Sequence, residues 1–147
     1  DPVKQCRCLP GQILNYKKRI SGPIIDRIDL HIDLPPVKVE KLTGNIHSES
    51  SGHVKKRVQK ARDIQTARFK KIKSNYGKIV CNSDLASKNI KELVLLSNEC
   101  LKLLRQAVST MQLSARTYFR IIKVARTIAD LESEKDLKVP HIAEALQ

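Results

Sequence analysis

The chain has 147 residues, and its 28 Lys and Arg outnumber its 15 Asp and Glu to give a formal net charge of +13. Hydrophobic residues make up 41%, which is enough for a buried core and argues against a disordered chain. Aromatic residues make up only 3%, too few for a surface that stacks the bases of a single strand. No apolar run approaches the roughly 18 residues of a membrane span, and the polar start is not a secretory signal.

The positive charge favours an acidic partner. Nucleic acid comes first, because each Lys or Arg near a phosphate releases a condensed counterion on binding. An anionic membrane surface and a solvated basic face that only aids solubility are the alternatives. The charge is concentrated in one stretch that holds a single acid, Asp63, and these bases: Lys55, Lys56, Arg57, Lys60, Arg62, Arg68, Lys70, Lys71 and Lys73.

Residues 1–36 combine short helical signals with one strand pattern. Pro10 opens a short helix that runs to about Ile20, where Ser21-Gly22-Pro23 ends it, and residues 24–27 form one further turn. Residues 28–34 alternate apolar and polar side chains, which predicts a strand with one buried face. Because one strand cannot make a sheet, either its partner strand is missing or it pairs with another molecule.

The rest of the chain reads as helical. A linker over residues 37–48 precedes a long basic helix from Ser50 or Ser51 to about Ser74. Ser114 is the expected N-cap of a helix that runs to about Glu132, with Leu113 and Tyr118 as its hydrophobic staple. Further helices are expected over residues 88–95, 97–111 and 141–146, so the fold is predicted to be mainly α.

The four cysteines predict a reducing compartment, hence the cytoplasm. Cys6 and Cys8 are too close for an ordinary disulfide and make only half of a zinc site, which needs about four ligands. Their other interpretation is an inert exposed pair. Cys100 falls on an apolar helical stripe and is predicted to be in the core, whereas Cys81 lies in a turn.

Two stretches are distinctive, although the chain holds no phosphate-binding G-x-x-x-x-G-K-[ST] loop and no complete catalytic set. Residues 16–32 read YKKRISGPIIDRIDLHI, and LSAR at 113–116 is followed by IKVARTIADL at 122–131. In this order and spacing they resemble the C-terminal part of the magnesium-chelatase-like AAA+ ATPases, and among these the competence protein ComM (YifB) family. The resemblance covers nearly the whole chain and includes PHIAEAL at 140–146.

The resemblance implies a role for Arg27. In such ATPases the matching stretch lies just before the last core strand, and its arginine projects into the nucleotide site of the neighbouring subunit. Arg27 is therefore the candidate arginine finger, since a guanidinium is always charged and can neutralise charge on the transferring γ-phosphate. The alternative is an ordinary interface arginine, or one paired with Asp26 or Asp29.

Arg116 matches the sensor 2 arginine of the family, which reaches the γ-phosphate from the helical lid. It falls in the first turn of a predicted helix, where backbone N–H groups favour an anion. The alternative is a solvated arginine that is mildly unfavourable against the helix dipole. The resemblance makes Arg27 and Arg116 the catalytic candidates, and Arg116 also the nucleotide-binding one.

The resemblance also implies cofactors that this chain does not complete. The phosphate-binding loop and the acidic metal-binding motif of the family lie upstream of residue 1, so ATP and Mg²⁺ belong to a longer protein. The absence of an initiator Met and the Asp1-Pro2 start favour the same interpretation. We expect this segment to hydrolyse no ATP alone and to hold no cofactor tightly. In the family a second Cys pair precedes the Cys6-x-Cys8 pair, so zinc is possible only in the complete protein.

The sequence therefore predicts three parts: a core remnant with the arginine finger and last strand at 1–36, the linker and basic helix at 37–74, and a helical lid at 75–147. The leading hypothesis is the lid and subunit-interface part of a ring ATPase, a hexamer, that remodels DNA or drives branch migration in recombination. Its basic helix would then face DNA or a neighbouring subunit. The alternatives are the motor subunit of a magnesium chelatase and a stand-alone helical DNA-binding module.

Overall fold

The structure is a computed structural model that describes residues 7–20, 22–25, 27–32, 34–35, 37, 48–70 and 79–147. The chain divides into two compact units, Asp1–Ser48 and Glu49–Gln147. The three-part division expected from the sequence, with boundaries at residues 36 and 74, stays a prediction. Both of those boundary residues lie outside the described ones.

The described residues of the first unit include two short helices, α1 (Pro10–Lys18) and α2 (Gly22–Ile25). Pro10 begins α1, where its missing N–H costs no hydrogen bond. The side-chain oxygen of Gln12 accepts a hydrogen bond from the backbone N–H of Leu9 at 2.9 Å, which satisfies a donor at the helix start. Neither helix buries a residue.

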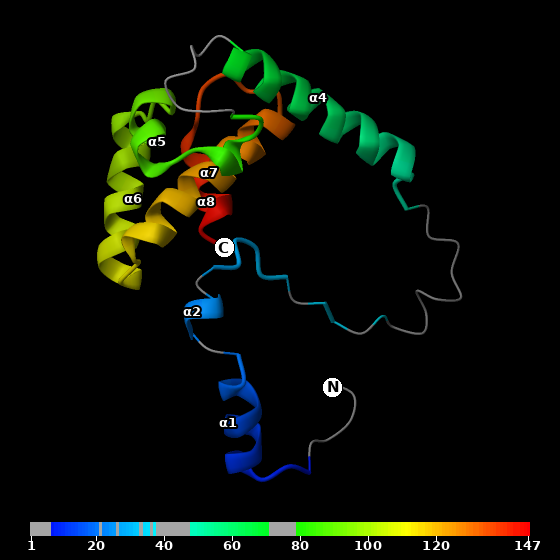
Figure 1. Cartoon of the computed structure of the whole chain (residues 1–147), viewed down its shortest axis with the longest axis vertical. Coiled ribbons are helices and arrows are strands. Elements are labelled where there is room, and N and C mark those ends of the chain that lie inside the picture. The colour runs from blue at the N-terminus through cyan, green and yellow to red at the C-terminus, as the bar shows by residue number, and fades with distance from the viewer. Residues whose placement is uncertain are drawn as a thin grey trace. The chain divides into compact units, whose positions relative to one another are not determined.

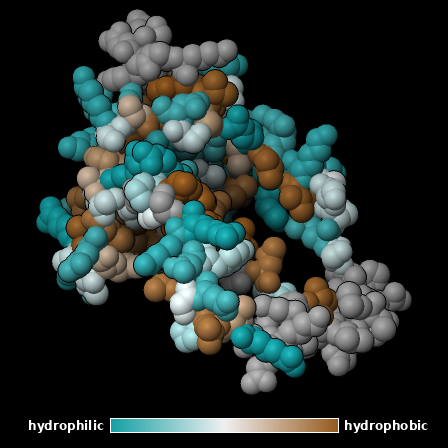
Figure 2. All heavy atoms as spheres, turned by 60° about the horizontal axis from the view of Figure 1, so that its bottom comes forward, coloured by the Kyte–Doolittle hydropathy of each residue, from teal (hydrophilic) through white to brown (hydrophobic). Residues whose placement is uncertain are grey.

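The strand predicted over residues 28–34 is not formed by its described residues. A strand needs a partner for its backbone hydrogen bonds, and the described part of the first unit supplies none. The apolar side chains on its intended buried face, at Ile28, Leu30, Ile32 and Leu34, are all exposed. Figure 2 shows apolar side chains among hydrophilic ones on the surface of the molecule.

The second unit is a helical bundle, as the sequence predicted (Figure 1). Among the residues described between 49 and 147, the only β pairing is an isolated bridge between Leu96 and Leu137. Its helices are α4 (Ser51–Lys70), the 3-10 turn η1 (Asn82–Asp84), α5 (Ser87–Leu93), α6 (Asn98–Met111), α7 (Ala115–Leu131) and α8 (Val139–Ala145).

Helix α7 lies at the centre of the bundle and packs against α4, α5, α8 and η1. Its apolar residues recur at helical spacing, so Ile121, Ile122 and Ala125 share one buried face. Cys100 and Leu104 of α6 are fully buried in the same cluster. The prediction that Cys100 lies in the core is thereby confirmed.

Local chemistry fixes both ends of α7. Ser114 is its N-cap, since the serine hydroxyl oxygen accepts a hydrogen bond from the Thr117 N–H at 3.1 Å. At the other end Ser133 adopts a left-handed φ of 63°. The Glu134 N–H then donates to the Ala129 carbonyl at 2.8 Å, and the Ser133 N–H donates to the Asp130 carbonyl at 3.1 Å. This Schellman motif ends the helix and reverses the chain toward α8.

Helix α4 is only half packed. Its buried residues are Ala61, Gln65 and Phe69, which lie in its second half at helical spacing. Val54 and Val58 continue the same face into the first half, but both are exposed. Residues 51–60, which span about 15 Å at 1.5 Å per residue, therefore form an arm that projects from the bundle (Figure 1).

Candidate functional site

Arg27 lies just after α2 and is exposed. Its guanidinium donates a hydrogen bond from Nη1 to the carbonyl of Pro23 at 2.8 Å. A single bond to an exposed carbonyl holds the side chain weakly and leaves the charge uncompensated by that contact. The alternative pairing with Asp26 falls on a residue outside the described ones.

Arg116 is the second residue of α7 and is also exposed. The Ser114 cap and the start of the helix place its guanidinium at the positive end of the helix dipole. An anion that reached this end would meet both the dipole and the arginine charge. Arg27 therefore lies in the first unit and Arg116 in the second.

The lysines of α4 differ from its arginines, each of which has a side-chain partner. Lys55, Lys56, Lys60 and Lys70 are exposed, and no contact within the described chain uses their charges. They are available to phosphates along the helix.

The first two arginines of α4 already have neighbours. Arg57 forms a two-pronged ion pair with Glu49, at 2.9 and 3.2 Å, with both side chains about half exposed. Such an exposed pair contributes little to stability, so Arg57 can exchange Glu49 for a phosphate. Arg62 donates to the side-chain oxygen of Gln65 at 3.2 Å. Lys71 and Lys73 lie outside the described residues.

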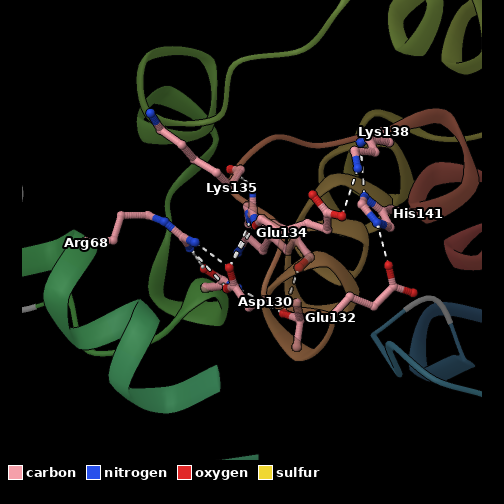
Figure 3. A network of polar contacts seen from close by, with 11 residues as sticks. Arg68, Asp130, Glu132, Glu134, Lys135, Lys138 and His141 are labelled. Carbon is pink, nitrogen blue, oxygen red and sulfur yellow. Dashed lines mark hydrogen bonds and ion pairs between the residues drawn. The ribbon is translucent and has the colours of Figure 1, made fainter. Parts of the chain in front are cut away.

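Arg68, which the sequence analysis grouped with the phosphate-binding candidates, turns inward in the structure. Its two terminal nitrogens donate to the two carboxylate oxygens of Asp130 on α7, one of them at 3.0 Å (Figure 3). The Arg68 side chain is 25% exposed and the Asp130 side chain is 0% exposed. Because both terminal nitrogens of Arg68 donate to Asp130, this guanidinium cannot also form a pair of parallel hydrogen bonds with a phosphate.

Asp130 is the centre of a polar network among the described residues. Besides Arg68, its carboxylate accepts hydrogen bonds from Nε of Arg126 at 3.1 Å and from the side-chain amide of Asn82 at 2.9 Å. The Asn82 amide also donates to Thr127 at 3.0 Å. A buried carboxylate can accept about four hydrogen bonds, so the acceptor sites of Asp130 are filled.

These contacts explain the titration of the buried pair. Burial raises the pKa of Asp130, but hydrogen bonds from Arg68 and Asn82 and the charge of Arg126 outweigh it, so the pKa lies below its ordinary value. Burial lowers the pKa of Arg126, although Asp130 partly opposes that shift. Asp130 is therefore ionised at neutral pH, and an arginine guanidinium keeps its proton in proteins.

Arg126 also ties the end of α7 to the following turn. Its Nη1 donates to the Lys135 carbonyl at 2.8 Å and its Nη2 donates to the Glu134 carbonyl at 2.6 Å. The Schellman motif presents these carbonyls. One arginine thus bridges a buried carboxylate and the backbone that leads into α8.

A second contact set fixes α8 at its start (Figure 3). The Lys138 N–H donates to Nδ1 of buried His141 at 3.0 Å, so the ring hydrogen of the neutral imidazole lies on Nε2. That nitrogen lies 2.9 Å from a carboxylate oxygen of Glu132. Nζ of Lys138 lies 2.8 Å from a carboxylate oxygen of Glu134, and its hydrogen bond lowers the pKa of that carboxyl.

This network was not predicted from the sequence, although the sequence contains a signal of it. Arg126 and Asp130 are separated by four residues and lie on the same face as Ile122, so the apolar stripe of α7 carries a charged pair. Arg126, Thr127 and Asp130 also belong to the second distinctive stretch quoted above. The partner from α4, 62 residues away in the chain, could not be found from periodicity.

Metal binding has no support among the described residues. Cys8 is exposed, and Cys6 lies outside the described part of the chain. Within that part, no group of three or more His, Cys, Asp or Glu is placed to hold a metal ion. No described helix is long and apolar enough to cross a membrane.

Comparison with known families gives two matches that together span both units. Residues 48–147 match the family described as the C-terminal part of magnesium chelatase subunit ChlI. Residues 1–42 match the family described as magnesium chelatase subunit ChlI.

Relatives with sequence similarity include the competence protein ComM of Haemophilus influenzae, which is 41% identical over 142 residues. The protein YifB of Escherichia coli is 37% identical over 142 residues. Each alignment covers 95% of this chain and 26% of the relative. The chain therefore spans about a quarter of the length of these relatives.

Proposed function

The chain belongs to the magnesium chelatase ChlI family, and from that premise we propose that it forms the lid and subunit-interface part of a ComM-like AAA+ ATPase that remodels DNA. The complete ATPase binds ATP and Mg²⁺ through segments that this chain does not contain. It acts as a ring of identical subunits, a hexamer, in the cytoplasm. Arg27 serves as the arginine finger of a neighbouring nucleotide site, and Arg116 serves as the sensor 2 arginine.

The observation that carries this proposal is the state of the two arginines. Both Arg27 and Arg116 are exposed, so neither guanidinium is sealed in a buried ion pair of its own unit. An always-charged group that remains accessible can meet the γ-phosphate of ATP when a subunit or a lid closes on it. Arg126, which is buried and hydrogen-bonded to Asp130, could not reach a nucleotide in this way.

The DNA part of the proposal rests on α4. Its exposed bases Lys56, Lys60 and Lys70 lie on the helix side away from Ala61, Gln65 and Phe69. A row of ammonium groups on a projecting helix fits a phosphate backbone and selects no base sequence. The low aromatic content excludes stacking as the main source of affinity.

Fluorescence anisotropy of the chain with duplex, forked and single-stranded DNA tests this surface. The double variant Lys56→Met/Lys60→Met removes two charges from the arm of α4. The matched control Lys102→Met/Arg105→Met removes two exposed charges from α6. We expect the slope of log affinity against log salt to fall by about two for the α4 variant, because two fewer phosphates are neutralised, and to stay unchanged for the control.

Two results would oppose DNA binding through α4. The first is an affinity that does not fall as salt rises. The second is an equal weakening of binding in the α4 and α6 double variants, which would show a general effect of net charge.

The second candidate function is the motor subunit of a magnesium chelatase, which the description of the matching family favours. It would use the same arginines and drive metal insertion through partner proteins. Hydrolysis of ATP by the complete protein, with and without branched DNA, separates the two functions. Stimulation by DNA supports the ComM-like function, and indifference to DNA supports the chelatase.

A further inference from the structure

We infer that Arg68 and Asp130 are positioning residues that lock the basic helix α4 onto α7, so that the nucleotide-facing end of the lid and the DNA-facing arm move as one body. This inference rests on the proposed function for what the two ends contact. The lock itself rests on the contacts described above and can be tested separately.

The first step is the geometry of the lock. Arg68 approaches Asp130 with both terminal nitrogens, and a two-pronged pair fixes direction as well as distance. Arg68 also donates to the side-chain oxygen of Asn82 at 3.3 Å, so one guanidinium joins α4, η1 and α7. The arginine further lies 5.9 Å from the ring centre of Phe69, its buried neighbour on α4.

The second step concerns the polar surface of α7 on which Arg68 binds. Contacts that do not involve α4 already hold this surface in place. Lys123 donates to the Ser83 carbonyl at 2.9 Å, Thr127 accepts from Asn82, and Asp130 accepts from the same amide. These three residues of α7 therefore fix η1 along one helix face. Asp130 is held by Arg126 and Asn82 without any help from α4. Removal of Arg68 therefore leaves the Asp130 carboxylate charged and still hydrogen-bonded to Arg126 and Asn82.

The third step is that only the second half of α4 packs on the bundle. The helix buries only Ala61, Gln65 and Phe69, and Gln65 is polar. Removal of Arg68 therefore removes the two-pronged polar contact between α4 and Asp130 and leaves the packing of these three side chains. Because Arg116 and Asp130 are 14 positions apart on one continuous helix, about 21 Å of α7 links the nucleotide end to the lock.

Hydrogen exchange of the 147-residue chain, followed by mass spectrometry, tests the lock directly. Arg68→Met removes the two-pronged donor and keeps much of the side-chain length. Lys70→Met, two residues away on the same helix, removes an equal charge from an exposed site and is the matched control. We expect amides of residues 61–70 to exchange at least about tenfold faster in Arg68→Met, and those of α6, α7 and α8 to change less than about twofold.

Two outcomes overturn the lock. In one, the amides of α4 exchange as slowly in Arg68→Met as in Lys70→Met, which means that the ion pair does not hold the helix. In the other, α6, α7 and α8 lose protection together with α4, which makes Arg68 part of the general stability of the bundle. Arg68→Lys is a further check: a single ammonium cannot reproduce the fork, so we expect intermediate protection.

Steady-state kinetics of the complete ATPase tests the coupling. We expect Arg68→Met to lower the maximal stimulation of ATP hydrolysis at saturating DNA by at least about fivefold, with the KM for ATP unchanged. Lys70→Met should instead raise the DNA concentration needed for half stimulation and keep the maximum. Full stimulation in Arg68→Met overturns the coupling. A wild-type ATPase that DNA does not stimulate refutes the proposed function, while hydrogen exchange still decides on the lock.

Discussion

Replacement of Asp130 by Asn is the most informative single change in the bundle. The variant keeps the shape of the side chain but removes the negative charge that two guanidinium groups share. It also replaces an acceptor oxygen by an NH2 group, which then faces donors from Arg68, Arg126 or Asn82. We expect the free energy of unfolding at pH 7 to fall by about 3 kcal/mol, the lower end of the range for a broken buried ion pair.

The environments of the two arginines explain why we expect a loss of stability at the lower end of that range. Arg126 has a side chain only 7% exposed and would keep an uncompensated charge, whereas Arg68 is 25% exposed and can turn to water. Arg126 also retains its bonds to the carbonyls of Glu134 and Lys135. The penalty therefore comes mainly from one buried cation and from donors left without an acceptor.

The difference in stability between the wild type and Asp130→Asn should depend on pH. The pKa of Asp130 in the folded protein is lowered from its ordinary value of 3.8, so its stabilising effect is complete above that value. It is lost as the pH falls through the lowered folded pKa, where the wild-type carboxyl also becomes neutral. Urea unfolding of both proteins at several pH values should show a stability difference that is constant near neutrality and shrinks in acid. A difference that stays the same from pH 7 down to acid would refute the charge-based explanation.

Four further substitutions are tested by thermal or urea unfolding, three of them in the bundle and one, at Arg27, in the first unit. Ile122→Ala, at a side chain 1% exposed, should lower the free energy of unfolding by about 2–5 kcal/mol. Leu95→Ala, at an exposed position, should change it by less than about 0.5 kcal/mol. Equal effects of the two substitutions would contradict the assigned core. Ser114→Ala should cost about 1 kcal/mol, because Thr117 loses its hydrogen bond, and an unchanged midpoint would contradict that cap. Arg27→Ala should leave stability unchanged, since the Pro23 contact is exposed.

Local signals in the sequence predicted the helices of the bundle well. Ser114 marked the start of α7, and the apolar spacing around Cys100 and Leu104 marked the buried face of α6. Each of these signals acts within a few residues, so the sequence carries it openly. The left-handed residues Gln112 and Ser133 were not foreseen, because Gly is the usual residue at such positions and neither helix end has one.

Two features needed information that lies far away in the chain. The alternation over residues 28–34 is real, but a strand forms only when another strand pairs with it. Arg68 was grouped with the solvated bases because its partner, Asp130, lies on a different helix. Charge counts predict a basic surface, yet they cannot identify the one arginine that a buried carboxylate draws inward.

Arg27 is proposed to act in the nucleotide site of a neighbouring subunit, and an experiment that mixes two kinds of variant subunit tests this role. Subunits of the complete ATPase that carry Arg27→Ala are mixed with subunits whose phosphate-binding loop is disabled, and ATP hydrolysis is measured. Each population alone should be nearly inactive, by about a thousandfold or more for the arginine variant. Mixing should restore activity, because intact arginines then face intact nucleotide sites. Activity that stays absent in the mixture, or full activity of the Arg27→Ala protein alone, would contradict it.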